Sequence, residues 1–490
     1  MRSESKLKRN LSLQTIFQII NVSLPFITAP YLARVLGAEQ LGIFSYTYSV
    51  VSYFTLLAML GTVSYGTKSI ASVKDSKKER SKTFWNIFCL QIIVTSIALV
   101  FYVVYLLFFC EENYLIANIQ IINIIACLFD INWFFWGIEK FELVIWVNVI
   151  VKILTVISII CLVKNVADLW IYALIMFLGT LLSQLCMFKF LFRYVSWERI
   201  DLSLIKSHLR CSLILFIPLL ATSVYHTMDK TMLGIFSTYE QSGFYYNSDK
   251  VINIPMNIIN GIGIVMLPRI SNLRVEQKFY ESEKLCINTL ELISAAGIAI
   301  SCGIASVSKE FIPFFYGEGY EACILLTIVF APIFLVKSIS AIIRMIYLIP
   351  MSKEREYTKA VIAGAVINLF SNILLIPKYG ALGAVIATFL AELGSALIQI
   401  YYISGSIKNF KKAAERFLIY SFIGLFMILV VRGISCIFLS NLIKLLLEIS
   451  VGSVLYASLC TIYWKKTNNR FYNTLIIPLL EPFSKRHKYL

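Results

Sequence analysis

Charged residues are scarce in this sequence. Asp, Glu, Lys and Arg make up only 15% of its 490 residues, whereas 59% are hydrophobic. The mean hydropathy is +0.78. A water-soluble fold cannot bury that much apolar surface, so lipid must be the solvent for most of the chain. The composition therefore predicts an integral membrane protein.

The sequence also lacks the short motifs that carry metal, redox or nucleotide chemistry. Its 11 cysteines are scattered through apolar segments and form no C-x-x-C pair, which argues against zinc sites and a disulfide framework. It has no G-x-x-x-x-G-K phosphate loop, so ATP is not expected to power it. No predicted loop is long enough for a catalytic domain. We therefore expect no enzyme and no cofactor other than a coupling Na⁺ or H⁺.

Long hydrophobic runs are what the sequence has in abundance. Only helices and closed barrels satisfy all backbone groups in lipid, and about 20 apolar residues are enough for one helical crossing. Such runs predict an all-α membrane protein with fourteen transmembrane helices. The predicted helices cover residues 11–34, 41–63, 84–109, 114–137, 143–163, 168–192, 210–236, 244–268, 286–307, 321–349, 358–377, 381–404, 416–439 and 442–464.

The positive charges in the connections predict the orientation. Thirty-three of the 44 Lys and Arg residues fall in the two tails and in alternate loops, five fall on the opposite side, and six fall within helices. Cytoplasmic loops collect Lys and Arg, so both termini are predicted to be cytoplasmic. The net charge of +16 is thus explained by topology, and no nucleic-acid partner is implied.

An internal repeat is visible in short motifs. Glu39-Gln40-x-Gly42 recurs as Glu240-Gln241-x-Gly243, and Leu178-Gly179-Thr180 recurs as Leu393-Gly394-Ser395. The repeat predicts two parallel six-helix lobes, with a substrate bound between them as in many transporters. The expected division is an N-terminal lobe (1–200), a C-terminal lobe (201–410), a trailing helix pair (411–464) and a basic cytoplasmic tail (465–490).

Ionisable residues inside the predicted helices are the candidate site residues, because charges within a bilayer are costly and usually functional. Seven cations are candidates to bind an anionic substrate: Lys152, Lys337, Lys230, Arg344, Arg34, Lys250 and Arg432. Four acids are candidates for ion coupling: Asp229, Asp130, Glu392 and Asp249. The alternative is structural. Neighbours such as Asp229 and Lys230 point about 100° apart on a helix and can form ion pairs with other helices.

Several blocks resemble the bacterial Wzx-type polysaccharide flippases of the multidrug/oligosaccharidyl-lipid/polysaccharide exporter superfamily. These blocks, which run in the family's order along nearly the whole chain, are PYLARVLGAEQLGIFSY (30–46), DKTMLGIFSTYEQSGFYYNSDKVINIP (229–255), VMLPRIS (265–271), FYGEGYE (315–321) and NLFSNILLIPKYGALGAVIATFLAELG (368–394). The positions that match family motifs are Arg34 and the pair Asp229–Lys230.

The resemblance implies a function as well as a fold. It implies that an undecaprenyl-pyrophosphate-linked oligosaccharide moves from the inner to the outer leaflet of the bacterial cytoplasmic membrane by alternating access, powered by an ion gradient. Membrane lipid and the polysaccharide polymerase machinery are the other expected partners. Aromatic side chains that suit sugar rings are Tyr31, Tyr46, Tyr53, Tyr225, Tyr245 and Trp133. The alternatives are a flippase for the lipid-linked peptidoglycan precursor and a multidrug or cation antiporter of the same superfamily.

Overall fold

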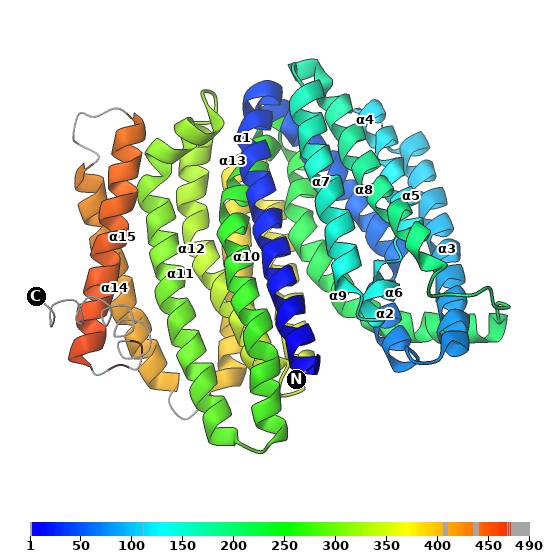
Figure 1. The fold of residues 1–490 in the computed structure, drawn as a ribbon. Coiled ribbons are helices and arrows are strands. Elements are labelled where there is room, and N and C mark those ends of the chain that lie inside the picture. Colours follow the sequence, from blue (N-terminus) through cyan, green and yellow to red (C-terminus); the bar gives the residue numbers. More distant parts are fainter. Residues whose placement is uncertain are drawn as a thin grey trace, which may run out of the picture. The chain divides into compact units, whose positions relative to one another are not determined.

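The computed structural model is helical throughout the part of the chain that it describes (Figure 1). The described residues are 2–110, 112–404, 410–434, 441–467, 469 and 471. They form fifteen α-helices, one 3-10 helix and one π-helix. The all-α prediction is confirmed. Most of the predicted basic tail, residues 465–490, lies outside the described residues.

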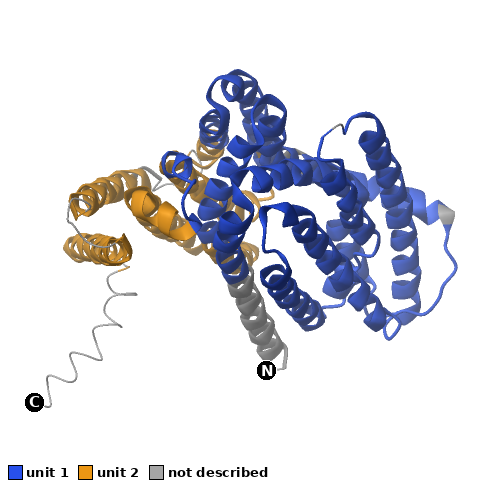
Figure 2. Cartoon of the chain, turned by 90° about the horizontal axis from the view of Figure 1, so that it is seen from above, with its two compact units in different colours: residues 1–257, 316–326, 357–395 blue, residues 258–315, 327–356, 396–490 orange. Residues whose placement is uncertain are grey.

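The chain divides into two compact units, coloured separately in Figure 2. Unit 1 comprises residues 1–257, 316–326 and 357–395. The helices that lie wholly or largely in it are α1 (Arg2–Met59), α2 (Thr62–Ser72), α3 (Lys77–Phe108), α4 (Tyr114–Ile119), α5 (Ile121–Leu128), α6 (Asn132–Gly137), α7 (Phe141–Leu162), the 3-10 helix η1 (Val166–Asp168), α8 (Leu169–Leu191), α9 (Leu202–Phe236), α10 (Tyr239–Val275) and α13 (Glu354–Ser404).

Unit 2 comprises residues 258–315, 327–356 and 396–490. It contains the second part of α10 and the end of α13, together with α11 (Phe279–Tyr316), α12 (Ala322–Ile343), the π-helix η2 (Arg344–Leu348), α14 (Phe410–Ile434) and α15 (Asn441–Lys466). Within this unit α14 and α15 pack side by side. The two units do not follow the predicted boundaries at residues 200 and 410, and the two-lobe division stays a prediction.

Helix starts and breaks follow from local chemistry. The side chains of Ser76 and Asp201 cap α3 and α9 by accepting hydrogen bonds from backbone N–H groups in the first turn. Two long helices are interrupted by glycines with positive φ, Gly37 in α1 (φ 79°) and Gly380 in α13 (φ 54°). Only glycine adopts these conformations without strain. Both glycines lie where the sequence predicts one span to end and the next to begin.

The structure contains 11 helices that are long and apolar enough to cross a membrane, or up to 12 if α9, which bends by 61° after Ile217, counts as one span. Two of them, Ser23–Ser72 and Glu354–Ser404, are 50 and 51 residues long. A helix of that length extends roughly 75 Å, whereas the hydrocarbon core is about 30 Å thick, so each can hold two crossings. A multi-span membrane fold is confirmed; the count of fourteen and the cytoplasmic placement of the termini stay predictions.

The two copies of the Glu-Gln-x-Gly motif contact each other. A Cβ atom added at Gly42 would lie 1.7 Å from the carbonyl oxygen of Tyr239, and one added at Gly243 would lie 1.8 Å from that of Ala38. No side chain fits there, so these glycines let the backbones of α1 and α10 touch, as small residues do at close helix crossings in membranes. We call this contact the glycine seam. The internal repeat therefore coincides with a packing device in unit 1.

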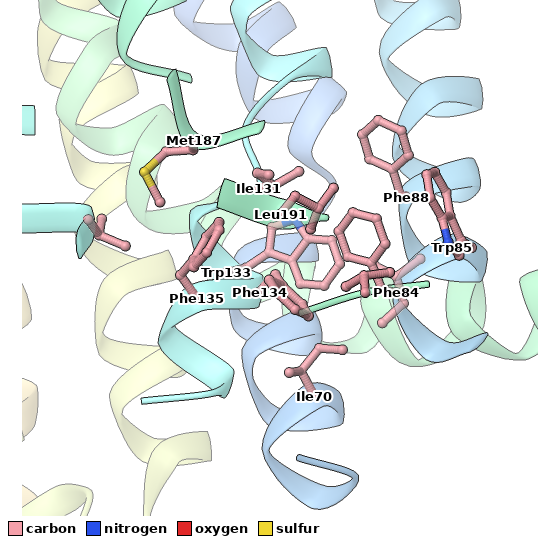
Figure 3. Packing of buried hydrophobic residues seen from close by; sticks show 13 residues of the cluster. Ile70, Phe84, Trp85, Phe88, Ile131, Trp133, Phe134, Phe135, Met187 and Leu191 are labelled. Carbon is pink, nitrogen blue, oxygen red and sulfur yellow. The ribbon is translucent and has the colours of Figure 1, made fainter. Parts of the chain in front are cut away.

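An aromatic cluster forms part of the core of unit 1 (Figure 3). Trp133 on α6 is fully buried there, 5.5 Å from the ring of Phe84, and its indole N–H donates to Gln91 Oε1 at 3.0 Å. A Cβ at Gly66 would come within 2.5 Å of the indole. Trp133 is thus a packed core residue, and its expected contact with sugar rings is wrong because no face of the ring is accessible.

Candidate functional site

A buried carboxylate on α9 is the most heavily hydrogen-bonded acid in unit 1 among the described residues. Asp229 is 3% exposed. Its Oδ1 accepts from the amides of Asn368 (2.9 Å) and Asn372 (2.6 Å) on α13. Its Oδ2 accepts from the hydroxyls of Tyr245 on α10 (2.6 Å) and Thr388 on α13 (2.7 Å). Three helices thus converge on one carboxylate, and all four donors are neutral. We call these five residues the Asp229 cluster.

Within the described residues, the hydrogen bonds of the cluster do not reach every oxygen. The single hydroxyl proton of Thr388 faces both Asp229 Oδ2 and, at 2.9 Å, the carbonyl of Ala384. Asn372 already donates to Asp229 and, at 3.1 Å, to Asn368 Oδ1. Its own Oδ1 is buried and accepts no hydrogen bond from any residue the structure describes. Carboxylate, amide, hydroxyl and carbonyl oxygens are the ligands that hard cations prefer. The cluster can therefore hold a cation.

Glu392 lies one helical turn beyond Thr388 on α13. It is 6% exposed and lies beside Tyr225, which is one turn before Asp229 on α9. Two of the four acids predicted for ion coupling, Asp229 and Glu392, are therefore on the facing sides of the same two helices. The sequence does not show this proximity, because 163 positions separate the two residues.

In the sequence Asp229 is followed by Lys230, and Asp249 by Lys250. In the structure the ion pair instead joins Lys230 to Asp249. Lys230 Nζ lies 3.0 Å from Asp249 Oδ2, and the two side chains are only 23% and 12% exposed. Asn253 also donates to Asp249 Oδ1 at 2.8 Å. Lys250 lies over the ring of Tyr246, 4.0 Å from its centroid. Lys230 and Asp249 thus form an ion pair of the kind that the structural alternative expects, and this pair ties α9 to α10 next to the Asp229 cluster.

The other candidates of unit 1 occupy separate places. Asp130 is half-buried and its Oδ1 accepts from the backbone N–H of Asn132 at 3.1 Å, which is a local turn. Arg34 is exposed on α1, and its Cγ would lie 3.3 Å from a Cβ at Gly317. Lys152 is exposed on α7. None of the three contributes to the hydrogen bonds of the Asp229 cluster described above.

Three predicted cations belong to unit 2. Lys337 is half-buried on α12, and Arg344 begins the π-helix η2. Arg432 donates to the carbonyl of Ala305 at 3.1 Å and lies 3.7 Å from Glu310 Oε2. Lys444 approaches the same carboxylate at 3.3 Å. Arg432 is thus part of an ion-pair network that joins α11, α14 and α15.

A second buried carboxylate organises the other end of these helices. Glu291 on α11 is 2% exposed and accepts from Arg416, from Tyr420 (2.8 Å) and from Asn469 (2.7 Å). The indole of Trp464 donates to Tyr420 at 2.8 Å. Each hydrogen-bonding group around Glu291 is satisfied by the others, which is typical of a structural network.

Outside the spans, two pKa shifts have simple causes. Glu139 lies 2.6 Å from Lys74 and accepts its hydrogen bond, which raises the pKa of that ammonium. The hydroxyl and backbone N–H of Ser203 donate to Asp201 and lower the pKa of that carboxyl. Both side chains remain charged at neutral pH, and both interactions fix helix ends rather than form a site.

Sequence reasoning missed the residues that surround Asp229. Asn368, Asn372 and Thr388 all lie within a block that was singled out as a family motif, but none was selected as a site residue. One signal in the sequence could have identified the two asparagines. Asn368 and Asn372 are four positions apart within an apolar segment, so they share a helix face and must find polar partners.

Residues 7–274 of the chain match a family model described as "Polysaccharide biosynthesis protein". The chain is 24% identical over 390 residues to "Putative O-antigen transporter" of Escherichia coli (strain K12), covering 79% of this chain and 94% of that protein. It is 26% identical over 404 residues to the protein of the same name from Shigella dysenteriae, covering 80% and 99%.

A solved structure shares the fold. The "Lipid II flippase MurJ, inward closed conformation" superposes with a TM-score of 0.74, covering 92% of this chain and 99% of that chain at 16% identity. At that identity the likeness shows the fold alone. The family model, however, covers more than half of the sequence, and it includes Asp229. The chain therefore belongs to the polysaccharide biosynthesis protein family.

Proposed function

We propose that this protein is a flippase that moves an undecaprenyl-pyrophosphate-linked oligosaccharide from the inner to the outer leaflet of the bacterial cytoplasmic membrane, for the synthesis of a surface polysaccharide. The protein is a transporter and not an enzyme. The proposal is supported by the family match and by two relatives named as O-antigen transporters, which align over 94% and 99% of their length.

The substrate explains why charges are retained in an apolar fold. A pyrophosphate with several sugars cannot cross hydrocarbon unaided, because its charges and hydroxyls would lose their hydrogen bonds to water. Lysine or arginine side chains at intermediate depth supply an electrostatic replacement for that water. Lys152 and Lys337 are the proposed substrate cations. Lys230 and Arg432 are weaker candidates, since each already lies against a carboxylate.

The glycine seam is the proposed outer gate. The distribution of positive charges predicts an outer position for Glu39–Gly42 and Glu240–Gly243. The backbones of α1 and α10 touch at these two segments. Alternating access requires such a contact to close when the inner side is open and to separate when the substrate is released outside. Backbone contacts suit this role because they close tightly without side-chain rearrangement.

The Asp229 cluster is the proposed coupling-ion site, and this geometry is the observation on which the mechanism depends. The carboxylate of Asp229, the amide oxygens of Asn368 and Asn372, the hydroxyl of Thr388 and the carbonyl of Ala384 would hold the ion. Na⁺ fits this set, because every ligand is an oxygen and Asn372 Oδ1 has no donor among the described residues. The bound ion would balance the negative charge of Asp229, which the four neutral hydrogen-bond donors leave uncompensated.

Reconstitution tests the function. The purified protein is placed in liposomes that contain a labelled undecaprenyl-pyrophosphate oligosaccharide, and access of a membrane-impermeant glycosidase is followed. In protein-free liposomes about half of the label is accessible; the wild-type protein should expose the remainder. The variant Lys152→Gln/Lys337→Gln should lose most of this movement, whereas Lys189→Gln/Lys206→Gln, which removes the same charge from exposed positions, should retain it.

The same liposomes separate the alternatives. If the protein moves labelled lipid-linked peptidoglycan precursor and does not move the oligosaccharide lipid, it is a flippase for the peptidoglycan precursor. Uptake of an organic cation without movement of either lipid would assign it to the antiporters. Equal rates for the wild type and for the Lys152→Gln/Lys337→Gln variant would exclude these two lysines from the substrate path.

A further inference from the structure

Unit 2 contains a pocket that the proposed transport path does not use. It has a volume of about 550 Å³ and is lined by residues from the N-terminal parts of α11 and α14. Lys284, Lys412 and Arg416 contribute positive charge to its wall, and Glu283 is the one carboxylate among the described residues that line it. A volume of this size is in the range that accommodates a small ligand or a lipid headgroup.

One of the three cations of the pocket, Arg416, is held in place by a buried carboxylate. Arg416 donates to the buried carboxylate of Glu291, which also binds Tyr420 and Asn469, so the guanidinium has a fixed position at the pocket wall. Lys284 and Lys412 are exposed, and within the described part of the chain neither forms an ion pair. The first turns of α11 and α14 add the positive ends of two helix dipoles. The pocket therefore favours an anion.

The level of the pocket relative to lipid follows from α14. Lys412, Glu415 and Arg416 are the last charged residues before a run whose exposed side chains are apolar. Leu418, Phe422 and Leu425 expose 58%, 72% and 56% of their surface. In a helix that is long and apolar enough to span a membrane, such exposure is expected against hydrocarbon. The change from charged to apolar residues thus places the pocket at the level of the headgroups.

The start of α11 supports the same level. Phe279 and Tyr280 line the pocket and are 55% and 75% exposed. Arg274 lies over the Phe279 ring at 5.5 Å. Exposed aromatic rings next to basic residues are typical of the membrane interface. The positive-charge count assigns both the Arg269–Lys284 and the Lys408–Arg416 segments to the cytoplasmic side, so the leaflet is the inner one.

We propose that this pocket binds the phosphate headgroup of an anionic phospholipid of the inner leaflet, with Lys284, Lys412 and Arg416 as its ligands. Basic pockets between transmembrane helices on the cytoplasmic side are suited to such headgroups. The bound lipid joins the first turns of α11 and α14, and through Arg416 and Glu291 it reaches the residues that follow α15. It is a bound lipid and not the transported substrate.

Native mass spectrometry of the full-length protein tests the site. The protein is titrated with phosphatidylglycerol or phosphatidylcholine, and bound lipid is counted. Wild type should retain phosphatidylglycerol more strongly. Lys284→Gln/Lys412→Gln should weaken it on the order of tenfold, because each basic group near a headgroup contributes substantially to binding. Glu283→Gln should strengthen it, and Lys189→Gln/Lys206→Gln should have no effect.

Two results would overturn the proposal. One is equal retention of phosphatidylglycerol by the wild type and by Lys284→Gln/Lys412→Gln, with Glu283→Gln also unchanged. The other is full displacement of the lipid by millimolar inorganic phosphate, which would make the pocket a site for a soluble anion. Since the measurement counts bound lipid and needs no transport, its outcome is independent of the proposed flippase function.

Discussion

Replacement of Asp229 by asparagine isolates the charge of the proposed ion site. The two side chains have nearly the same shape, and the asparagine oxygen can still accept from Asn368 and Asn372 at the positions of the present 2.9 and 2.6 Å contacts. The new amide can donate to the hydroxyls of Tyr245 and Thr388, which can rotate. Weaker hydrogen bonds and a smaller desolvation cost offset each other. Without a coupling ion, we expect the free energy of unfolding to change by no more than about 1–2 kcal/mol.

The effect of sodium should be larger and selective. A ligand present at 100 times its dissociation constant stabilises the folded state by about 2.7 kcal/mol. Unfolding entropy scales with length, and for 490 residues 1 kcal/mol corresponds to roughly 1 °C. Saturating Na⁺ should therefore raise the melting temperature of the wild type by about 3 °C. Asp229→Asn should lose this increase, because the only formal negative charge of the cluster is gone.

Tryptophan fluorescence during thermal unfolding in detergent measures this difference. NaCl is compared with choline chloride at the same ionic strength, so that general screening cancels. Asp75→Asn, which removes a carboxylate from an exposed loop position, is the matched control and should respond to Na⁺ as the wild type does. The reasoning would be refuted if the wild type showed no sodium-specific increase, or if Asp229→Asn kept it.

Two further variants test the packing around this site. Lys230→Met should lower the free energy of unfolding by about 3 kcal/mol, because it leaves Asp249 buried without its partner. Lys230→Met/Asp249→Leu should recover most of that loss. Equal losses for the single and double variants would show that the pair is not coupled. Gly243→Val should reduce the amount of folded protein in the membrane by forcing α1 and α10 apart, whereas Gly261→Val on the same helix, where a Cβ meets nothing within 4 Å, should not.

Much of the fold could be predicted because lipid imposes a simple rule. Each crossing needs a long apolar helix, so the long apolar segments and the breaks near Gly37 and Gly380 could be located from hydrophobicity alone. The repeated Glu-Gln-x-Gly motif also carried information, since its two copies meet at the glycine seam. In this protein the repeated motif marks a physical constraint, which is the close approach of two backbones.

The site could be predicted only in part. Ionisable residues within apolar helices were found because their cost is visible in the sequence. Their partners were not, since Asp229 binds Asn368, Asn372 and Thr388 from a helix more than a hundred positions away. The pairing of Lys230 with Asp249 likewise depends on how α9 and α10 face each other. Hydrophobicity and charge locate a costly group, but only packing determines which group compensates it.

The burial of Trp133 shows the same limit for aromatic residues. In the sequence it is one of the aromatic residues that suit sugar rings, but such a ring can face either a cavity or the core. The close approach of Gly66 and the hydrogen bond to Gln91 decide in favour of the core. Neither contact leaves a local pattern, because Gly66 and Gln91 belong to helices that pack against α6 only after folding.

The central claim is that a cation at the Asp229 cluster drives the movement of a lipid-linked oligosaccharide. The most direct measurement is the initial rate of oligosaccharide-lipid movement in proteoliposomes with an imposed Na⁺ gradient, for the wild type and for Asp229→Asn. The account predicts a faster rate for the wild type with the gradient than without it, and no response of the Asp229→Asn variant. A wild-type rate that is indifferent to sodium and proton gradients, or an equal response of the variant, would contradict it.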